Sequence, residues 1–357
     1  MNQRLKKFLE KTVREGASDL HLTVDAPPTL RVSGELVPLS GSNPLAEEDV
    51  QELIFAMVDD EQKEQLLINK EVDFAFSYTG DGVEKGARFR VNAFHTRGNL
   101  AAALRRIPLR VPSIDELNLP SFFHTLTELP QGFVIFTGPA GCGKSTSIAS
   151  IIDEISRSRA AHIITVEDPV EYVFPHRQAL IAQREVGRDT LSWNVGLRNV
   201  LREDPDVIFV GEMRDTATIS SAVTMAETGH LVFSTLHTNS ASQTVDRIID
   251  AFPDERQDQI ASQLAASLEA VIAQRLIPSI EGGLVPVCEI LLVTPAVRNL
   301  IREGERHQLD NVITTSSEQG MVSLERALAR LVREGVVERD VARRVALRPQ
   351  EFSRLLH

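Results

Sequence analysis

The sequence has few cysteines and no long apolar run, and both shortages exclude whole classes of protein. Its only two cysteines among 357 residues, Cys142 and Cys288, cannot build a disulfide framework, and without a CxxC pair a four-cysteine zinc site is excluded. No apolar run approaches the roughly 20 residues of a membrane-spanning helix, so no transmembrane segment is expected. The basic N-terminal stretch lacks an apolar core and a cleavage site, which argues against a signal peptide. A cytoplasmic protein with reduced thiols fits these absences.

An excess of basic residues is also missing. The formal net charge of −12 argues against broad binding to the phosphate backbone of nucleic acids, although a local basic groove is compatible with that average. The apolar content of 42% is ordinary for a globular protein, and the length predicts two or three domains. We therefore expect a multidomain globular protein with no nucleic acid as a partner.

Residues 1–110 combine helical and strand patterns, which predicts an α+β domain. The expected elements are helices at 1–16 and 46–68 and strands at 20–24, 30–32, 72–78, 87–98 and 100–108, with turns at 26–28 and 80–82. A linker follows at residues 111–118, and its Pro-containing sequence begins at Leu109.

Residues 119–357 alternate between strand and helix patterns, which predicts an α/β domain with a largely parallel sheet. The expected strands are 132–137, 162–166, 206–211 and 231–236, and helices are expected at 190–203 and 216–228. The remainder, 254–357, is predicted to be mostly helical with an interruption at 286–290. Ligands of such sheets bind at the carboxyl ends of the strands.

The stretch GPAGCGKST lies directly behind the first of these strands and fits the phosphate-loop pattern GxxxxGK[ST]. Its candidate nucleotide-binding residues are Gly138, Pro139, Ala140, Gly141, Cys142, Gly143, Lys144, Ser145 and Thr146. Glycines allow the backbone N–H groups to curl around phosphate oxygens. Lys144 can then neutralise the β- and γ-phosphates, and the Ser145 hydroxyl can hold Mg²⁺. A glycine-rich turn could match by chance, but the preceding strand and the apolar helix behind it favour a nucleotide site.

Acidic residues follow two further strands. Glu212 ends strand 206–211, where a carboxylate can act as a metal ligand or polarise water beside the phosphates. Glu167, Asp168 and Glu171 follow strand 162–166, and one of them could orient the water for hydrolysis. The residues alone do not choose between Glu167 and Glu171, and Asp168 could simply end the strand.

Histidines lie at both ends of strand 231–236. His230 and His237 cannot share a metal, because seven residues of extended chain separate them by roughly 20 Å. His237 falls at the edge with the phosphate loop and could sense the γ-phosphate, whereas His230 is either functional or a structural hydrogen-bonding group.

Four arginines lie close together in the first domain, at positions 90, 97, 105 and 106. Charged residues on strands usually form a solvated face. If the first domain of another subunit covers the nucleotide, these arginines could instead stabilise transition-state charge as arginine fingers.

Seven segments follow one another in an order that resembles the secretion ATPases of the type II secretion and type IV pilus systems. They are SDLHL, FRVNAF, GPAGCGKST, VEDPVEY, LREDPDVIFVGEMRD, AETGHLVFSTLHTN and AQRLIP, and together they cover nearly the whole chain. Within that family, AVRNLIREG at 296–304 resembles the signature of the pilus retraction ATPases. The missing cysteine quartet and the short N-terminus agree with that branch.

The resemblance implies a homohexameric motor that binds ATP between a PAS-like N-terminal domain and a RecA-like C-terminal domain. It matches Glu171 to the catalytic glutamate of the family and Glu212 to the Walker B glutamate. It also matches residues 230–237 to the histidine motif, and Arg90 and Arg105 to the finger arginines. Cys142, where relatives usually have serine, and Arg106, where threonine is common, depart from the family pattern.

By the same resemblance, we expect an ATPase that powers pilus retraction and twitching motility. It would dock on the cytoplasmic side of an inner-membrane pilus platform protein, with an accessory retraction ATPase as a further partner. The alternatives are such an accessory ATPase itself, an assembly or secretion ATPase, a RecA-like DNA motor, and a nucleotide switch that does not hydrolyse ATP.

The segment from Pro295 to Arg302 has its own predicted role. Thr294 and Pro295 form a helix-start signal, and the apolar residues that follow make one face of the helix. Arg298 and Arg302 line a different side, which the resemblance suggests transmits force to a partner. Packing on the domain core is the alternative.

Overall fold

The computed structural model describes residues 2–32, 34–80, 83–107 and 110–356. Residues 81–82 of the turn predicted at 80–82, and the segment 108–109, where the linker sequence begins, lie outside these residues. The chain divides into two compact units, of which unit 1 comprises Met1–Arg110 with Pro169–Val173 and unit 2 the remainder. Within the described residues, no helix has the length and apolarity needed to cross a bilayer.

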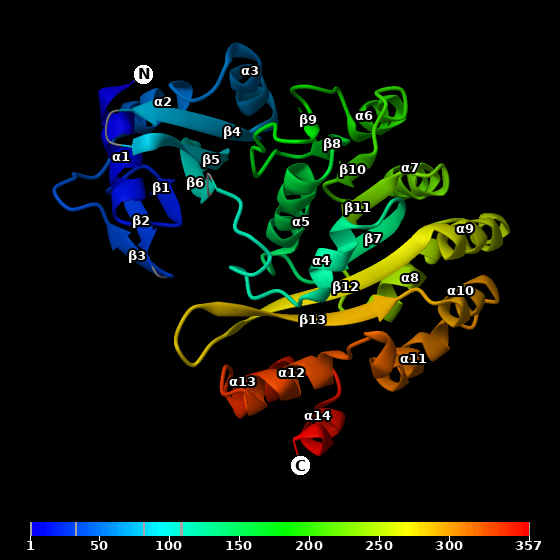
Figure 1. Ribbon diagram of the computed structural model, residues 1–357. Coiled ribbons are helices and arrows are strands. Elements are labelled where there is room, and N and C mark those ends of the chain that lie inside the picture. Colours follow the sequence, from blue (N-terminus) through cyan, green and yellow to red (C-terminus); the bar gives the residue numbers. More distant parts are fainter. Residues whose placement is uncertain (1, 33, 81–82, 108–109, 357) are drawn as a thin grey trace. The chain divides into compact units, whose positions relative to one another are not determined.

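Unit 1 is built on a six-stranded sheet in the order β3-β2-β1-β6-β5-β4, and all its pairings are antiparallel (Figure 1). Its strands are β1 (Asp19–Leu22), β2 (Thr29–Val32), β3 (Glu35–Pro38), β4 (Glu71–Gly80), β5 (Val83–Thr96) and β6 (Asn99–Ile107). Its helices are α1 (Gln3–Arg14), α2 (Glu47–Phe55) and α3 (Asp60–Asn69). The predicted α+β class is confirmed for this part of the chain.

Two details of unit 1 differ from the sequence prediction. The single helix expected at 46–68 is broken into α2 and α3, because the Asp59 side chain accepts a hydrogen bond from the Gln62 N–H at 2.8 Å and starts a new helix. The strand β3 was not predicted, since it is a short edge strand whose four residues are all exposed and leave no buried alternation.

Unit 2 contains a seven-stranded sheet in the order β13-β12-β7-β11-β10-β8-β9 (Figure 1). Its strands are β7 (Gly132–Thr137), β8 (His162–Glu167), β9 (Leu180–Glu185), β10 (Val207–Val210), β11 (Leu231–Thr235), β12 (Leu268–Pro278) and β13 (Leu284–Leu292). Neighbouring strands run parallel except for the outermost pair, β12 and β13. The predicted parallel α/β core is therefore confirmed.

Helices cover both faces of this sheet, because alternate residues of each buried strand point to opposite sides. The helices are α4 (Phe122–Thr127), α5 (Lys144–Ser158), α6 (Trp193–Val200), α7 (Thr216–Glu227), α8 (Ala241–Asp250), α9 (Asp254–Ser267), α10 (Pro295–Arg302), α11 (Leu309–Thr315), α12 (Leu324–Arg333), α13 (Arg339–Val345) and α14 (Pro349–Leu355). Phe133 and Ile135 of β7 join the core beneath α6 to α10, whereas Phe136 stacks edge-on against Phe123 of α4. The phosphate loop thus connects a fully buried strand to α5.

The prediction of a mostly helical segment from residue 254 onward is wrong for its central part. The chain passes from α9 directly into β12, and the hairpin of β12 and β13 extends the sheet. Residues 270–274 of β12 are all buried, so the strand lacks the alternation that distinguishes it from a buried helix. The short strand β9 was also not predicted.

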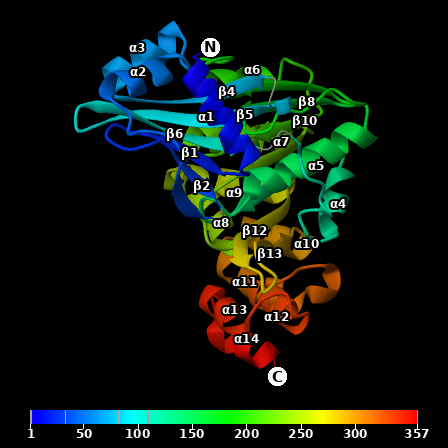
Figure 2. The same cartoon turned by 90° about the vertical axis from the view of Figure 1, so that its left-hand side faces the viewer.

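The last three helices, α12 to α14, form a separate apolar cluster with the hairpin. Its buried members are Ile277, Val287, Leu324, Leu328, Ala329, Val337, Ala342 and Phe352. The helices lie beside β13 at the C-terminal end of unit 2 (Figures 1 and 2).

Candidate functional site

The loop between β7 and α5 has a backbone that only glycine accommodates at two positions. Gly138 has a φ of 133°, and a Cβ built on it would lie 2.2 Å from the Gln274 carbonyl oxygen. Gly143 has a φ of 84° and would place a Cβ 3.0 Å from Nε2 of the same glutamine. Both φ values fall in the region that side chains disfavour. The glycines of the pattern are therefore required by the curled loop and by its close contact with β12.

Lys144 starts α5 and turns back over this loop. Its Nζ donates hydrogen bonds to the carbonyl oxygens of Gly138 at 2.8 Å and Pro139 at 3.1 Å, and the side chain is only 7% exposed. Burial raises the pKa of the Cys142 thiol, although the nearby Lys144 ammonium opposes that rise. The thiol therefore stays protonated at neutral pH, and the Lys144 ammonium is the charged group of the loop.

Gln274 of β12 holds the loop in place, a role that was not predicted from the sequence. Its Nε2 donates to the Cys142 carbonyl oxygen at 2.7 Å, and its Oε1 accepts from the Ser147 hydroxyl at 2.8 Å. The side chain is 2% exposed, so these bonds replace all contact with water. The segment AQRLIP around it supported the family resemblance, but only the fold shows what its glutamine touches.

The ends of three parallel strands meet beside the loop. The backbone N–H of Gly211 donates to Val166, Met213 donates to Thr235, and Leu236 donates to Phe136, so the strand ends are tied into one edge. This edge brings together Glu167, Glu212 and His237 of the predicted site residues, with the loop at the end of β7.

Glu212 lies between an arginine and a histidine at this edge. Its Oε1 accepts a hydrogen bond from Arg214 Nε at 2.6 Å, and its Oε2 lies 3.6 Å from His237 Nε2. Arg214 also lies 3.8 Å from Asp168, which links the ends of β10 and β8. Arg214 thus bridges the carboxylates of Glu212 and Asp168, and His237 lies on the other side of Glu212.

Glu167 has a different environment. It is 5% exposed, and its Oε1 accepts hydrogen bonds from Thr165 at 2.6 Å and Gln183 at 3.3 Å. Such bonds stabilise the carboxylate and fix its position. Gln183 comes from β9, a strand that was not predicted from the sequence.

The two histidines occupy opposite ends of β11. His237 is followed by Thr238, whose N–H donates to the Thr137 hydroxyl at 2.9 Å, so the histidine segment is fastened to the end of β7. His230 Nδ1 lies 2.9 Å from the Met225 carbonyl oxygen and 3.1 Å from the Thr228 hydroxyl. These contacts join α7 to β11 and fit the structural alternative for His230.

The remaining predicted site residues belong to unit 1. Glu171 lies 3.7 Å from Arg90, and Arg90 stands opposite Arg105 on the neighbouring strand. Arg105 donates from Nε to Asp19 at 2.9 Å while its side chain stays 74% exposed. Burial alone would raise the pKa of Asp19, but hydrogen bonds from Ser18 and Arg105 outweigh it and hold that pKa below its usual range. Asp19 thus orients the guanidinium of Arg105 and leaves its outer face open.

The other two arginines of this group do not lie beside Arg90 and Arg105 on the same face of the sheet. Arg97 lies in the turn after β5 with a φ of 52°. Arg106 follows Arg105 on β6 and stands opposite Phe89, so it points to the other face of the sheet from Arg105.

The helix α10 only partly matches its prediction. Val297 and Ile301 are buried in the core, as the apolar spacing indicated. Arg298 does not lie free beside Arg302, because it donates to the carbonyl oxygens of Ala265 and Ala266 at the end of α9 and to Glu269 at 2.7 Å. The expectation of two arginines that both face a partner is therefore wrong for Arg298, whereas Arg302 is exposed.

A Walker-type loop on a parallel sheet, with acidic residues at the neighbouring strand ends, defines a P-loop nucleoside triphosphatase. Residues 83–289 match the family described as type II/IV secretion system protein. The chain is 43% identical over 348 residues to the type IV pilus retraction ATPase PilT of Pseudomonas aeruginosa, covering 98% of this chain and 99% of that protein.

Two further relatives extend the comparison. The type IV pilus ATPase PilU of Pseudomonas aeruginosa is 41% identical over 333 residues, covering 93% of this chain and 86% of that protein. A crystal structure of the pilus retraction motor PilT with bound ADP is similar with a TM-score of 0.90 and 42% identity, covering 99% of this chain and 100% of that one. The chain therefore belongs to the type II/IV secretion system protein family and is an ATPase that binds ATP, as the sequence resemblance predicted.

We predict that Gln274→Leu weakens ATP binding about 10-fold or more while the fold is kept. The substitution leaves the Cys142 carbonyl and the Ser147 hydroxyl without their partner, and each lost hydrogen bond costs about 1 kcal/mol. Isothermal titration calorimetry with ATP measures the effect. Ser147→Ala should weaken binding less, since the loop carbonyl keeps its donor, and Ser150→Ala on the same helix is the matched control. Wild-type affinity in the Gln274 variant would show that the loop holds its shape alone.

Proposed function

We propose that this protein is the ATP-hydrolysing motor of type IV pilus retraction, and hence of twitching motility. The observation that supports this best is its similarity along the whole chain to a protein named for that role, together with a phosphate loop that is fully formed. The other proposals, on residues, partners and assembly, rest on this one.

Within the ATPase site, Lys144 would neutralise the β- and γ-phosphates and the loop N–H groups would bind their oxygens. The glycine positions fit a phosphate group, because a Cβ at Gly138 would collide with the neighbouring strand. Mg²⁺ in such sites is held by one or two protein groups together with phosphate oxygens, and Ser145 and Glu212 are the groups available at this edge. When bound, the metal offsets negative charge on the phosphates.

We propose Glu171 as the group that orients the attacking water. Glu167 is buried and already accepts two hydrogen bonds, which suits a fixed second carboxylate. Glu171 is about one-third exposed, and its partner Arg90 is itself a proposed finger residue. The two side chains would therefore act together on nucleotide bound in the assembled hexamer. His237, beside Glu212, would sense the γ-phosphate.

For the assembly, we propose a cytoplasmic homohexamer with domain boundaries at 1–110, 111–118 and 119–357. The pilus platform protein of the inner membrane would be its docking partner. Arg90 and Arg105 would act as arginine fingers that contact the bound nucleotide in the assembled ring. A PilU-like accessory ATPase would be a further partner. The similarity to PilU, at 41% identity, keeps an accessory role for this chain itself as the second candidate.

The first test separates chemistry from binding. Glu212→Gln keeps the shape of the side chain but removes its charge, so ATP should still bind while hydrolysis falls at least ~10²-fold. Lys144→Ala should instead weaken nucleotide binding, because the phosphates lose their main cationic partner. Phosphate release and calorimetry on both variants measure the two effects. Normal turnover in Glu212→Gln would remove this residue from the catalytic set.

The second test concerns the arginine fingers. If Arg105 acts on nucleotide at a cleft that assembly completes, specific activity should rise with protein concentration, and Arg105→Ala should lose hydrolysis while remaining a hexamer. Arg106→Ala is the matched control, since its side chain points to the opposite face of the sheet. Ultracentrifugation combined with an ATPase assay decides the matter. A fully active monomer would contradict the proposal.

The third test concerns the role of α10 in transmitting force. Arg302→Ala should leave fold, hexamer and ATPase largely intact but abolish retraction, because its side chain is exposed whereas Arg298 caps α9. Twitching motility in complemented deletion cells is the measurement, and Arg339→Ala, an exposed arginine of α13, is the control. Normal twitching with Arg302→Ala would leave α10 as core packing only.

A further inference from the structure

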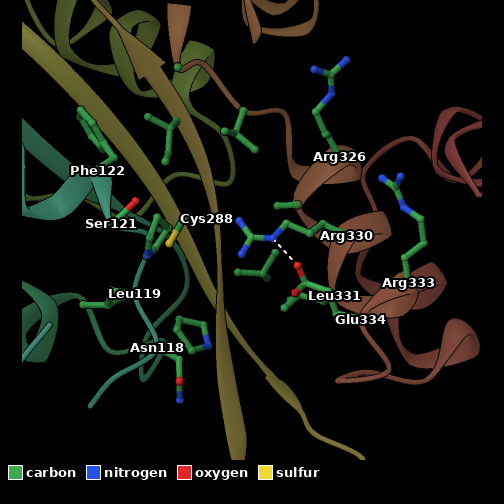
Figure 3. Close-up of a pocket in the computed structure, with 17 residues that line it drawn as sticks. Asn118, Leu119, Ser121, Phe122, Cys288, Arg326, Arg330, Leu331, Arg333 and Glu334 are labelled. Atoms are coloured by element: carbon green, nitrogen blue, oxygen red, sulfur yellow. Dashed lines mark hydrogen bonds and ion pairs between the residues drawn. The ribbon is translucent and has the colours of Figure 1, made fainter. Parts of the chain in front are cut away.

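A cavity of about 690 Å³ lies in unit 2 among three elements that the proposed ATPase mechanism does not use (Figure 3). One wall is the segment from Asn118 to Phe122, the second is the outer edge of β13, and the third is α12. This volume is in the range of sites that hold small ligands or a few peptide side chains.

The edge of β13 presents unused backbone groups to this cavity. Ile290 exchanges two hydrogen bonds with Val322, at 2.8 Å and 3.0 Å, so its N–H and C=O point away from β12. Residues two apart on an antiparallel strand share this direction, so the N–H and C=O of Cys288 and the C=O of Pro286 point outward as well. Among the described residues, these outward groups have no hydrogen-bond partner. The bridge to Val322 thus begins a strand pairing that stops where the cavity opens.

The walls of the cavity combine apolar surface with positive charge. Leu119, Phe122, Val287, Val322 and Leu331 provide the apolar part. Arg326, Arg330 and Arg333 come from successive turns of α12; Arg330 reaches from the helix toward β13, whereas the Arg333 side chain points away from that strand (Figure 3). Among the described residues that line the cavity, Glu334 is the one carboxylate, and it accepts a hydrogen bond from Arg330 Nε at 2.8 Å. This groove therefore carries positive charge, although the net charge of the whole chain is −12.

We propose that this groove binds an extended acidic segment of a partner protein, which adds to the edge of β13 as a further strand. The open backbone groups would bind the main chain of the segment, as in other peptides that extend a sheet. Alternate side chains would then fall on the apolar wall and beneath Arg330, where carboxylates pair with the guanidinium group. Arg330, which lies between α12 and β13, would contribute most to the preference for acidic over basic segments.

The test uses the full-length protein and a fluorescein-labelled peptide of alternating valine and glutamate, followed by fluorescence anisotropy. Binding should occur below about 1 mM and weaken as salt rises. Arg330→Ala should weaken it about 10-fold, whereas Arg354→Ala, an exposed arginine of α14, should not change it. Both variants should keep wild-type ATPase activity, which shows that they are folded.

Three comparison probes distinguish other occupants. The same peptide with lysine in place of glutamate, and the glutamate peptide with every backbone amide N-methylated, should each bind at least about 10-fold more weakly. Equal binding of the methylated peptide would overturn strand addition. Binding of decanoate but not of the acidic peptide would make the groove a site for amphiphilic anions and contradict the proposal. Equal affinity in wild type and Arg330→Ala, or no binding of the acidic peptide, would also overturn it.

Discussion

The close packing of the phosphate loop against β12 is the contact on which the rest of the site depends. Gly138 and Gly143 can approach the strand only because they lack a Cβ, and Gln274 then bonds both the loop and α5. The strand itself lies between the sheet core and the outer strand β13. The loop shape is therefore fixed by β12, a strand that follows the loop by more than a hundred residues.

The sequence predicted the loop, the parallel core and the acidic strand ends, because each has a local pattern that chemistry requires. Gln274 was not predicted, since its role arises only when β12 pairs with β7, more than a hundred residues earlier in the chain. β12 was mistaken for helix because a strand buried on both faces has no period of two. Arg298 was assigned to the surface because helical spacing does not reveal the neighbouring helix end whose last carbonyl groups it caps.

The proposed catalytic groups divide into two sets with different surroundings. Lys144, Glu167, Glu212 and His237 are fixed by the sheet edge of unit 2, whereas Glu171, Arg90 and Arg105 belong to unit 1. Hydrogen bonds hold Lys144, Glu167 and Glu212 of the first set, and the outer face of Arg105 stays open while Asp19 orients it.

The most direct test of the central claim compares pilus retraction speed with ATP turnover across variants that weaken the same loop by different amounts. Fluorescently labelled pili in complemented deletion cells give the speed, and the purified proteins give the turnover. The account predicts that speed falls in step with turnover from wild type through Ser147→Ala to Gln274→Leu, while pilus extension continues. Retraction at wild-type speed in a variant without turnover, or loss of extension in place of retraction, would contradict it.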